Sequence, residues 1–399
     1  MTALPVEIIF AILEHVYYRG NSGRPALILS REPDHKTLSA CSLISSTWLA
    51  PSRTLLYNHI TEYAAPRLMN ALKRCRRERW NALMKYVRIL DLSLVYQYDM
   101  GSSNSYQPAA KDWSDITQYE FELFMKYCSN LYELRIGASG IISLQPILTK
   151  LRTSTPPLYP TCLRALHISR CSVQSPILYE LLGFFPTVKF LTVEVEIAVH
   201  PPTNAASKFQ LYELSMYRTL PYEISSWLLS NSRDSLRIVE LRDLPSVRVS
   251  KLLQEYGPRL HSFRTMKYNI HTAMILRSCT NLRELIFLGL PSVPTLSIRE
   301  LPPTLEHFSL VHRHSEPSVG IADVLMLVRT LPNLKLLDSD EKLKYDSQFE
   351  LLEEICIKKG IDTKISEYGH WPNDEPVEAS TFPRRLTTLN FRSMNQFQT

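Results

Sequence analysis

The stretch that decides the fold is LRALHI, residues 163–168, where apolar residues occupy the first, fourth and sixth positions. The same pattern recurs as VKFLTV at 188–193, LYELSM at 211–216 and LRIVEL at 236–241. Further copies begin at residues 260, 282, 305 and 334, so the starts from residue 163 onward are 25, 23, 25, 24, 22, 23 and 29 residues apart. Such regular spacing indicates a structural unit that is repeated along the chain.

The segments between copies have helical periodicity and end in a turn. Examples are ILYELLGFFP at 177–186, VSKLLQEYGPR at 249–259 and ADVLMLVRTLPN at 322–333. A unit of 20–29 residues with the pattern L-x-x-L-x-L is typical of leucine-rich repeats. Stacked units place their strands on a concave parallel sheet and their helices on the convex side. The sequence therefore predicts an α/β fold with the shape of a horseshoe.

The ends of the repeat region are predicted from where the pattern weakens. Two earlier copies, VRILDL at 87–92 and LYELRI at 131–136, flank a polar insertion at 93–118. Residues 346–359 are predicted to form a closing helix and residues 360–368 a final strand, which would cap the last repeat. From residue 369 to 399 the periodicity is lost, which predicts a flexible tail. We therefore expect domains at 1–62 and 63–368, followed by that tail.

The first sixty residues predict three short helices. Pro5 fits the first position of a helix, and Asp34 is a good N-cap for a second one. Pro51 is expected to open a third helix. The apolar stripe of the first helix is formed by Leu4, Ile8, Ile12 and Val16, widened by Ile9 and Leu13, and the third helix would carry Leu55, Leu56 and Ile60. So small a unit cannot hide all of these residues, so part of the surface should contact another protein or the rest of this chain.

These residues also carry a resemblance. The runs LPxEIIxxIL at 4–13, DxxTLxxCSLxSxxW at 34–48 and PxR at 51–53 resemble an F-box domain, and most closely the F-box proteins of mushroom-forming (basidiomycete) fungi. The loop from Arg19 to Pro33 is longer than is usual in that family. Together with the repeats, the pattern resembles an F-box protein with C-terminal leucine-rich repeats.

The resemblance implies a subunit of an SCF-type (Skp–cullin–F-box) ubiquitin ligase. The F-box would bind the Skp-type adaptor, and the repeats would recruit a protein substrate. The chain itself is then not an enzyme, since catalysis would reside in other subunits. An alternative is an adaptor-binding scaffold that acts outside a ligase. The residues that match adaptor-binding positions of the family are Leu4, Pro5, Ile8, Ile9, Ile12, Leu43 and Trp48.

Composition and motifs argue against several other classes of function. The net charge of +6 is modest, and the basic run LKRCRRERW at 72–80 has no aromatic interleaving, so we expect no nucleic-acid partner. No apolar run reaches 18 residues, which argues against a membrane span. The seven cysteines include no C-x-x-C pair and suit the reducing cytoplasm or nucleus. We find no nucleophile motif, phosphate loop or metal-ligand spacing, so no catalytic, cofactor or metal residues are expected.

The repeat pattern also predicts where a substrate would bind. Side chains alternate along a strand, so the residues beside the fourth position and after the sixth face away from the leucines, toward the concave surface. They would form either a polar docking groove or an ordinary solvated sheet face. In this chain they include Arg135, His167, Glu194, Tyr217, Glu240, Arg242, Arg264, Glu284 and His307. Tyr217, Arg242 and Arg264 are the expected anchors, because Tyr and Arg are enriched among interface hot spots.

Overall fold

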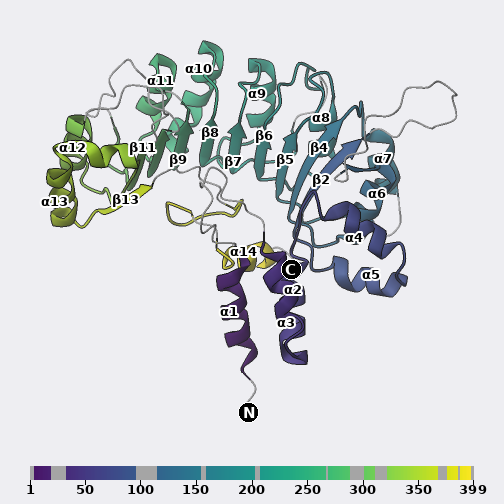
Figure 1. Ribbon diagram of the computed structural model, residues 1–399. Helices are drawn as coiled ribbons and strands as arrows, with labels where there is room; N and C mark the ends of the chain where they lie inside the picture. The colour runs from purple at the N-terminus through teal and green to yellow at the C-terminus, as the bar shows by residue number, and fades with distance from the viewer. Residues whose placement is uncertain are drawn as a thin grey trace, which may run out of the picture.

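The computed structural model describes residues 4–18, 33–95, 115–153, 159–202, 207–266, 268–287, 301–310, 321–366, 375–384 and 387–396. Within these ranges the chain is an α/β protein built on one parallel sheet of 13 strands (Figure 1). The strands are β1 (His59–Ile60), β2 (Ile89–Val95), β3 (Asp115–Ile116), β4 (Glu133–Ser139), β5 (Ala165–Ser169), β6 (Phe190–Val193), β7 (Glu213–Met216), β8 (Ile238–Leu241), β9 (Ser262–Thr265), β10 (Glu284–Phe287), β11 (His307–Leu310), β12 (Leu336–Asp340) and β13 (Asp362–Ser366).

The strands lie in the sheet in the order in which they occur in the chain. The order runs from β1 and β2 through β4 to β13, and β3 pairs with β2. The fourth motif positions pair with one another, so Leu166 lies opposite both Leu134 and Leu191. All three leucines are buried. Every predicted copy of the motif contains a strand, which confirms the predicted parallel sheet.

The crossover helices cover one face of this sheet. Figure 1 shows an arch, with the strands on its inner side and helices from α6 to α13 along its outer side. The main hydrophobic core lies between these two layers. The helices are α1 (Val6–Tyr17), α2 (His35–Cys41), α3 (Ser46–Leu56), α4 (Ala65–Leu72), α5 (Arg77–Met84), α6 (Gln118–Tyr127), α7 (Gln145–Thr153), α8 (Ile177–Phe184), α9 (Tyr222–Leu229), α10 (Val247–Tyr256), α11 (Ile270–Ser278), α12 (Ile321–Thr330), α13 (Phe349–Lys359) and α14 (Asn390–Asn395).

The end of the sheet matches its predicted elements. α13 is the expected closing helix, and β13 is the expected final strand. Gly360 separates them in the left-handed region, with φ of +66°. That conformation carries no steric penalty for glycine, so the helix stops there and the chain turns back toward β12.

The N-terminal helices agree with the prediction except at α3. Asp34 caps α2 by accepting a hydrogen bond from the Thr37 backbone N–H at 3.0 Å. Pro5 is the N-cap of α1 and not its first residue, so that helix begins one residue later than predicted. The prediction that Pro51 opens the third helix was wrong. α3 begins at Ser46, and Pro51 lies in its interior without an N–H to donate. Ile60 is in β1, so the first 62 residues already contribute a strand to the sheet.

The prediction of a flexible tail at 369–399 was wrong for the part that the structure describes. Residues 375–384 and 387–396, which we call the C-terminal strap, lie between the N-terminal helices and the inner face of the sheet (Figure 1). A second hydrophobic cluster joins these three parts. Its buried members are Ile9, Leu13, Tyr17, Leu38, Leu55, Ile89, Tyr132, Ala165, Phe190, Val377, Phe391 and Met394. The tail has no periodic apolar pattern, so its sequence did not predict that it would pack against this apolar surface.

Two predicted features fall outside the described residues. They are the 19–33 loop, apart from Pro33, and residues 96–114 of the insertion at 93–118.

Candidate functional site

α1 has two apolar sides with different surroundings. Ile9, Leu13 and Tyr17 recur every fourth residue and are buried in the second cluster. Ile8 and Ile12 are on another side of the helix, where they remain 48% and 39% exposed. A helix of 3.6 residues per turn separates these two rows, since each residue is rotated about 100° from the one before. Only one row is therefore used to hold the unit on the rest of the chain.

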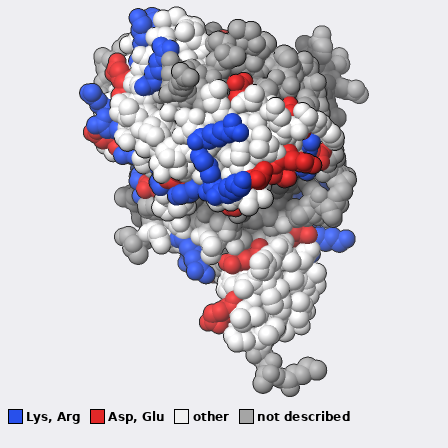
Figure 2. All heavy atoms as spheres, turned by 90° about the vertical axis from the view of Figure 1, so that its left-hand side faces the viewer, with Lys and Arg blue, Asp and Glu red and all other residues white. Residues whose placement is uncertain are grey.

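The turn between α2 and α3 adds further exposed apolar residues. Leu43 is 83% exposed and Ile44 is 60% exposed. Figure 2 shows the lobe that projects below the sheet as mostly uncharged. We call the exposed apolar residues of this unit the N-terminal apolar surface: Leu4, Pro5, Val6, Ile8, Ile12, Leu43, Ile44 and Leu49.

Two residues predicted to bind a partner are placed differently. Ile9 is fully buried among the chain's own side chains, so its assignment to direct contact with an adaptor is corrected. Its position on the inward row of α1 is the physical reason. Trp48 is only partly buried and packs against the second cluster. Leu4, Pro5, Ile8, Ile12 and Leu43 are all exposed, as a contact role requires.

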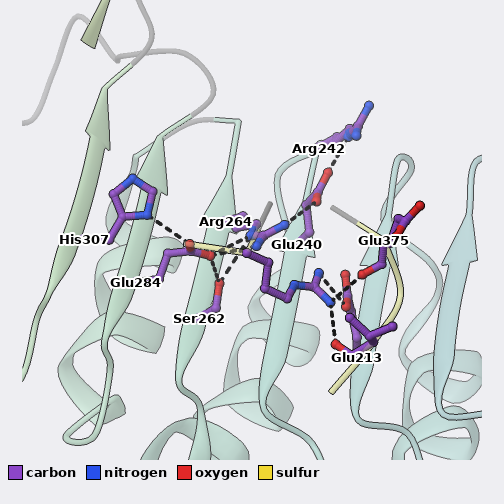
Figure 3. Close-up of polar contacts among 10 residues, drawn as sticks. Glu213, Glu240, Arg242, Ser262, Arg264, Glu284, His307 and Glu375 are labelled. Atoms are coloured by element: carbon purple, nitrogen blue, oxygen red, sulfur yellow. Dashed lines mark hydrogen bonds and ion pairs between the residues drawn. The ribbon is translucent and has the colours of Figure 1, made fainter. Parts of the chain in front are cut away.

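A chain of ion pairs crosses the inner face of the sheet (Figure 3). His307 Nδ1 lies 2.9 Å from Glu284 Oε2, and Arg264 Nη2 donates to Glu284 Oε1 at 2.8 Å. Glu240 continues the row, 4.0 Å from Arg264 Nη1, and accepts from Arg242 Nε at 2.6 Å. Ser262 donates to Glu284 at 2.6 Å. Strands β8 to β11 thus hold their charges in one connected row.

The remaining predicted residues form shorter groups on the same face. Arg135 Nε donates to Glu133 at 2.7 Å, and His167 Nε2 lies 3.0 Å from Glu194. The guanidinium carbon of Arg242 lies 3.5 Å from the centre of the Tyr217 ring, which is a cation–π contact. The alternation rule therefore placed these side chains on the correct face.

The prediction of an open polar groove was wrong over β8 to β11. Arg264 and Glu284 are at most 1% exposed, and Glu240 and His307 are also buried. Their charges are paired within the chain, so a partner cannot reach them without a rearrangement. Arg264 in particular is corrected from a docking anchor to a member of a buried ion pair. Tyr217 and Arg242 remain partly accessible and contact each other.

Some members of this face were missed, although the same rule would have found them. Asp91 lies in β2 at the position equivalent to Arg135, 2.9 Å from His59 Nε2. Glu133 and Glu213 precede the fourth motif position in β4 and β7, as Glu284 does in β10. His59 could not be found in this way, because β1 carries no copy of the motif.

The ion pairs lower the pKa values of the buried carboxyl groups. Burial alone would raise the pKa of Glu284, but Arg264 and His307 outweigh it and hold the pKa well below its usual range. The same balance holds at Asp91, where Arg135 and His59 overcome burial. Both carboxyl groups are therefore ionised at neutral pH. For Tyr217, burial raises the pKa of the hydroxyl above its ordinary value.

The C-terminal strap is held by side chains at the beginnings of the strands. Tyr132 Oη donates to the Pro376 carbonyl at 2.7 Å, and Tyr212 Oη donates to the Ala379 carbonyl at 3.3 Å. Arg283 Nη1 donates to the Ser380 carbonyl at 3.2 Å. These donors come from the segments just before β4, β7 and β10, so the strap crosses much of the sheet.

Ionic contacts add to these bonds. Arg384 Nη2 lies 2.9 Å from Glu213 Oε2, and both side chains are largely buried. Lys189 pairs with Glu378 at a more exposed position. Arg384 also donates to the carbonyls of Glu375 and Val377 at 3.2 and 3.1 Å. The Arg384 guanidinium thus fixes the turn of the strap and anchors it to β7.

The described part of the chain lacks two further features. Among the described side chains, no group of three or more His, Cys, Asp or Glu is arranged to hold a metal ion. Within the same part of the chain, no helix is both long enough and apolar enough to cross a membrane. No protein-family model matches the chain, and no curated protein matches its sequence.

Proposed function

We propose that this chain is the substrate-recruiting subunit of a cullin–RING ubiquitin ligase. In this proposal α1–α3 form an F-box domain that binds a Skp-type adaptor. The sheet and its outer helices form a leucine-rich-repeat horseshoe that recruits a protein. Catalysis is assigned to the other subunits of the ligase.

The observation that carries the proposal is the N-terminal apolar surface. α1 already uses one apolar row, that of Ile9 and Leu13, to pack on its own chain. A second exposed apolar row on the same helix, together with Leu43 and Ile44, has no role in that packing. Covering it would be favourable by about 25 cal/mol for each Å² of apolar area removed from water, before the costs of association. A protein partner that meets this surface would account for its exposure.

The repeat part of the proposal is supported by the strand register. Each unit contributes one short parallel strand, and equivalent motif residues pair from unit to unit from β2 to β12. Outer helices and an inner sheet face are the features expected of stacked leucine-rich repeats.

The test measures binding of the purified full-length chain to a purified Skp-type adaptor. The variant Ile8→Ala/Leu43→Ala truncates two exposed residues of the N-terminal apolar surface. Truncating one hot-spot residue costs about 2 kcal/mol or more, which is about 30-fold, and such losses are not additive, so the affinity of the double variant should fall at least 30-fold. The matched control is Ile142→Ala, since Ile142 is 80% exposed at a site remote from α1–α3. Unchanged binding by the double variant would refute the adaptor site.

A second assay separates a working ligase from a scaffold. Cullin, RING subunit and charged E2 are added to the chain and adaptor, and ubiquitin chain formation is followed. Transfer that depends on the N-terminal apolar surface supports the proposal. Adaptor binding without any cullin recruitment would favour a scaffold outside the ligase.

A further inference from the structure

The first half of the C-terminal strap, residues 375–384, lies on the inner face much as a bound peptide would. Its carbonyls at Pro376, Ala379 and Ser380 accept hydrogen bonds from Tyr132, Tyr212 and Arg283. Within the described residues, no backbone-to-backbone hydrogen bond joins this half to the sheet. The sheet therefore holds this segment through side chains alone.

The contacts between the sheet and residues 375–384 determine which other segments could bind at this site. Tyr and Arg side chains that donate to main-chain carbonyls can bind any extended segment, since every residue has a carbonyl. Three contacts select side chains: Glu213 takes the Arg384 guanidinium, Lys189 takes the Glu378 carboxylate, and the second hydrophobic cluster takes Val377. A segment with an apolar residue, then an acidic residue, and an arginine six positions after the acidic one reproduces all three. Of the two ion pairs, the buried Arg384–Glu213 pair is the more selective, because exposed pairs such as Lys189–Glu378 contribute little.

We propose that the inner face near the starts of β4 to β10 is a binding site for extended protein segments of this kind, and that strap residues 375–384 are its built-in competitor. A partner segment binds when it displaces this half of the strap. The second half stays in place, because it buries both Phe391 and Met394 in the second cluster, whereas the first half contributes only Val377. The site therefore binds only partners above a certain affinity, since a partner must displace a tethered segment that makes the same contacts.

This inference deepens the proposed function, because it names how the sheet would take a protein partner. Its test, however, uses no adaptor. The probe is a fluorescein-labelled peptide of residues 375–384, EPVEASTFPR, and binding is followed by fluorescence anisotropy. The full-length wild type is compared with Arg384→Ala, in which the tethered strap has lost its main anchor.

Wild type should bind the peptide at least 10-fold more weakly than Arg384→Ala, because its own strap occupies the site. The double variant Arg384→Ala/Glu213→Ala should lose the gained binding, and so should a peptide whose own arginine is replaced by alanine. Arg392→Ala is the matched control: it removes an exposed strap arginine in α14 and should behave as wild type. If Arg384→Ala lowers the melting temperature by more than a few degrees, Arg384→Lys serves as the milder variant.

Equal affinity of wild type and the Arg384 variants would overturn the competitor role. Absence of peptide binding to any folded Arg384 variant would overturn the site itself. Neither result bears on adaptor binding by α1–α3, so failure of this inference can be told apart from failure of the proposed function.

Discussion

Arg264 and Glu284 face each other from neighbouring strands β9 and β10, with 2.8 Å between Nη2 and Oε1 and almost no exposure to solvent. A charge buried without its partner is strongly unfavourable, so removing one side of such a pair costs about 3–5 kcal/mol. We therefore expect Glu284→Gln to lower the free energy of unfolding by about that amount, as measured by urea denaturation. The double variant Arg264→Met/Glu284→Gln should recover part of the loss.

The matched control for this prediction is an exposed pair. Arg248 lies 3.1 Å from Glu223, and both side chains are about half exposed or more. Arg248→Met should cost less than about 1 kcal/mol. A comparable loss at both sites would show that burial does not determine the strength of the Arg264–Glu284 pair.

The acid stability of the fold should depend on the same carboxylates. The pKa values of Glu284 and Asp91 are lower in the folded chain than in ordinary carboxyl groups. The unfolded chain therefore binds more protons as the pH falls through the ordinary range near 4, and the stabilisation present above that pH is lost. Denaturation at pH 7, 5, 4 and 3 should show a steep fall for wild type. Glu284→Gln should show a shallower one, and an unchanged slope would contradict this origin.

The C-terminal strap should stabilise α1. The Phe391 and Tyr17 rings lie 5.0 Å apart, edge to face, inside the second cluster. Phe391→Ala should cost about 3–5 kcal/mol in that region and accelerate amide hydrogen exchange in α1. Leu389→Ala, two residues away but 54% exposed, should change neither quantity. Exchange in α1 that is unaffected by Phe391→Ala would mean that the strap does not support the helix.

For the same reason the N-terminal unit should be unstable as a fragment. Cutting the chain after residue 62 removes the sheet and strap from the second cluster, so Ile9, Leu13 and Tyr17 keep only their neighbours in α2 and α3. We expect residues 1–62 to show little cooperative unfolding alone, in circular dichroism melts, and more helix once an adaptor is added. A sharply melting isolated fragment would contradict this account.

A side chain at Gly137 would have to displace the Arg170 side chain. A Cβ there would lie 2.9 Å from Arg170 Nε, and the Arg170 guanidinium pairs with both carboxylate oxygens of Glu62 at 2.7 and 2.8 Å. Arg170 also has φ of +50°, an uncommon conformation for a residue with a side chain. Gly137→Ala should displace Arg170 and lower the melting temperature.

Gly183 provides the control. A Cβ at this position in α8 would meet nothing within 4 Å. Gly183→Ala should therefore stabilise the chain slightly, by about 0.5–1 kcal/mol, because alanine loses less conformational freedom in a helix. Destabilisation by Gly183→Ala, or none by Gly137→Ala, would go against the packing described here.

The sequence by itself determined the parallel sheet and its outer helices. Leu166, Leu191 and Leu214 recur at a nearly regular spacing and at the same motif position, and burial of such residues requires strands stacked in one register. Local sequence also predicted the N-cap at Asp34 and the end of α13. The strand alternation also placed Arg264 and Glu284 on the inner face, since side chains of a strand point alternately to its two sides.

Only the tertiary structure decided which residues contact that inner face. Whether Arg264 is a free anchor or a buried ion pair depends on the carboxylates that the neighbouring strands bring to it, and no local pattern encodes that. The strap reaches Tyr132 and Tyr212 from more than 160 positions away in the sequence, through contacts of single side chains. In the same way, Ile8 and Ile9 are adjacent and equally apolar, yet packing against the strap and sheet buries one and leaves the other exposed.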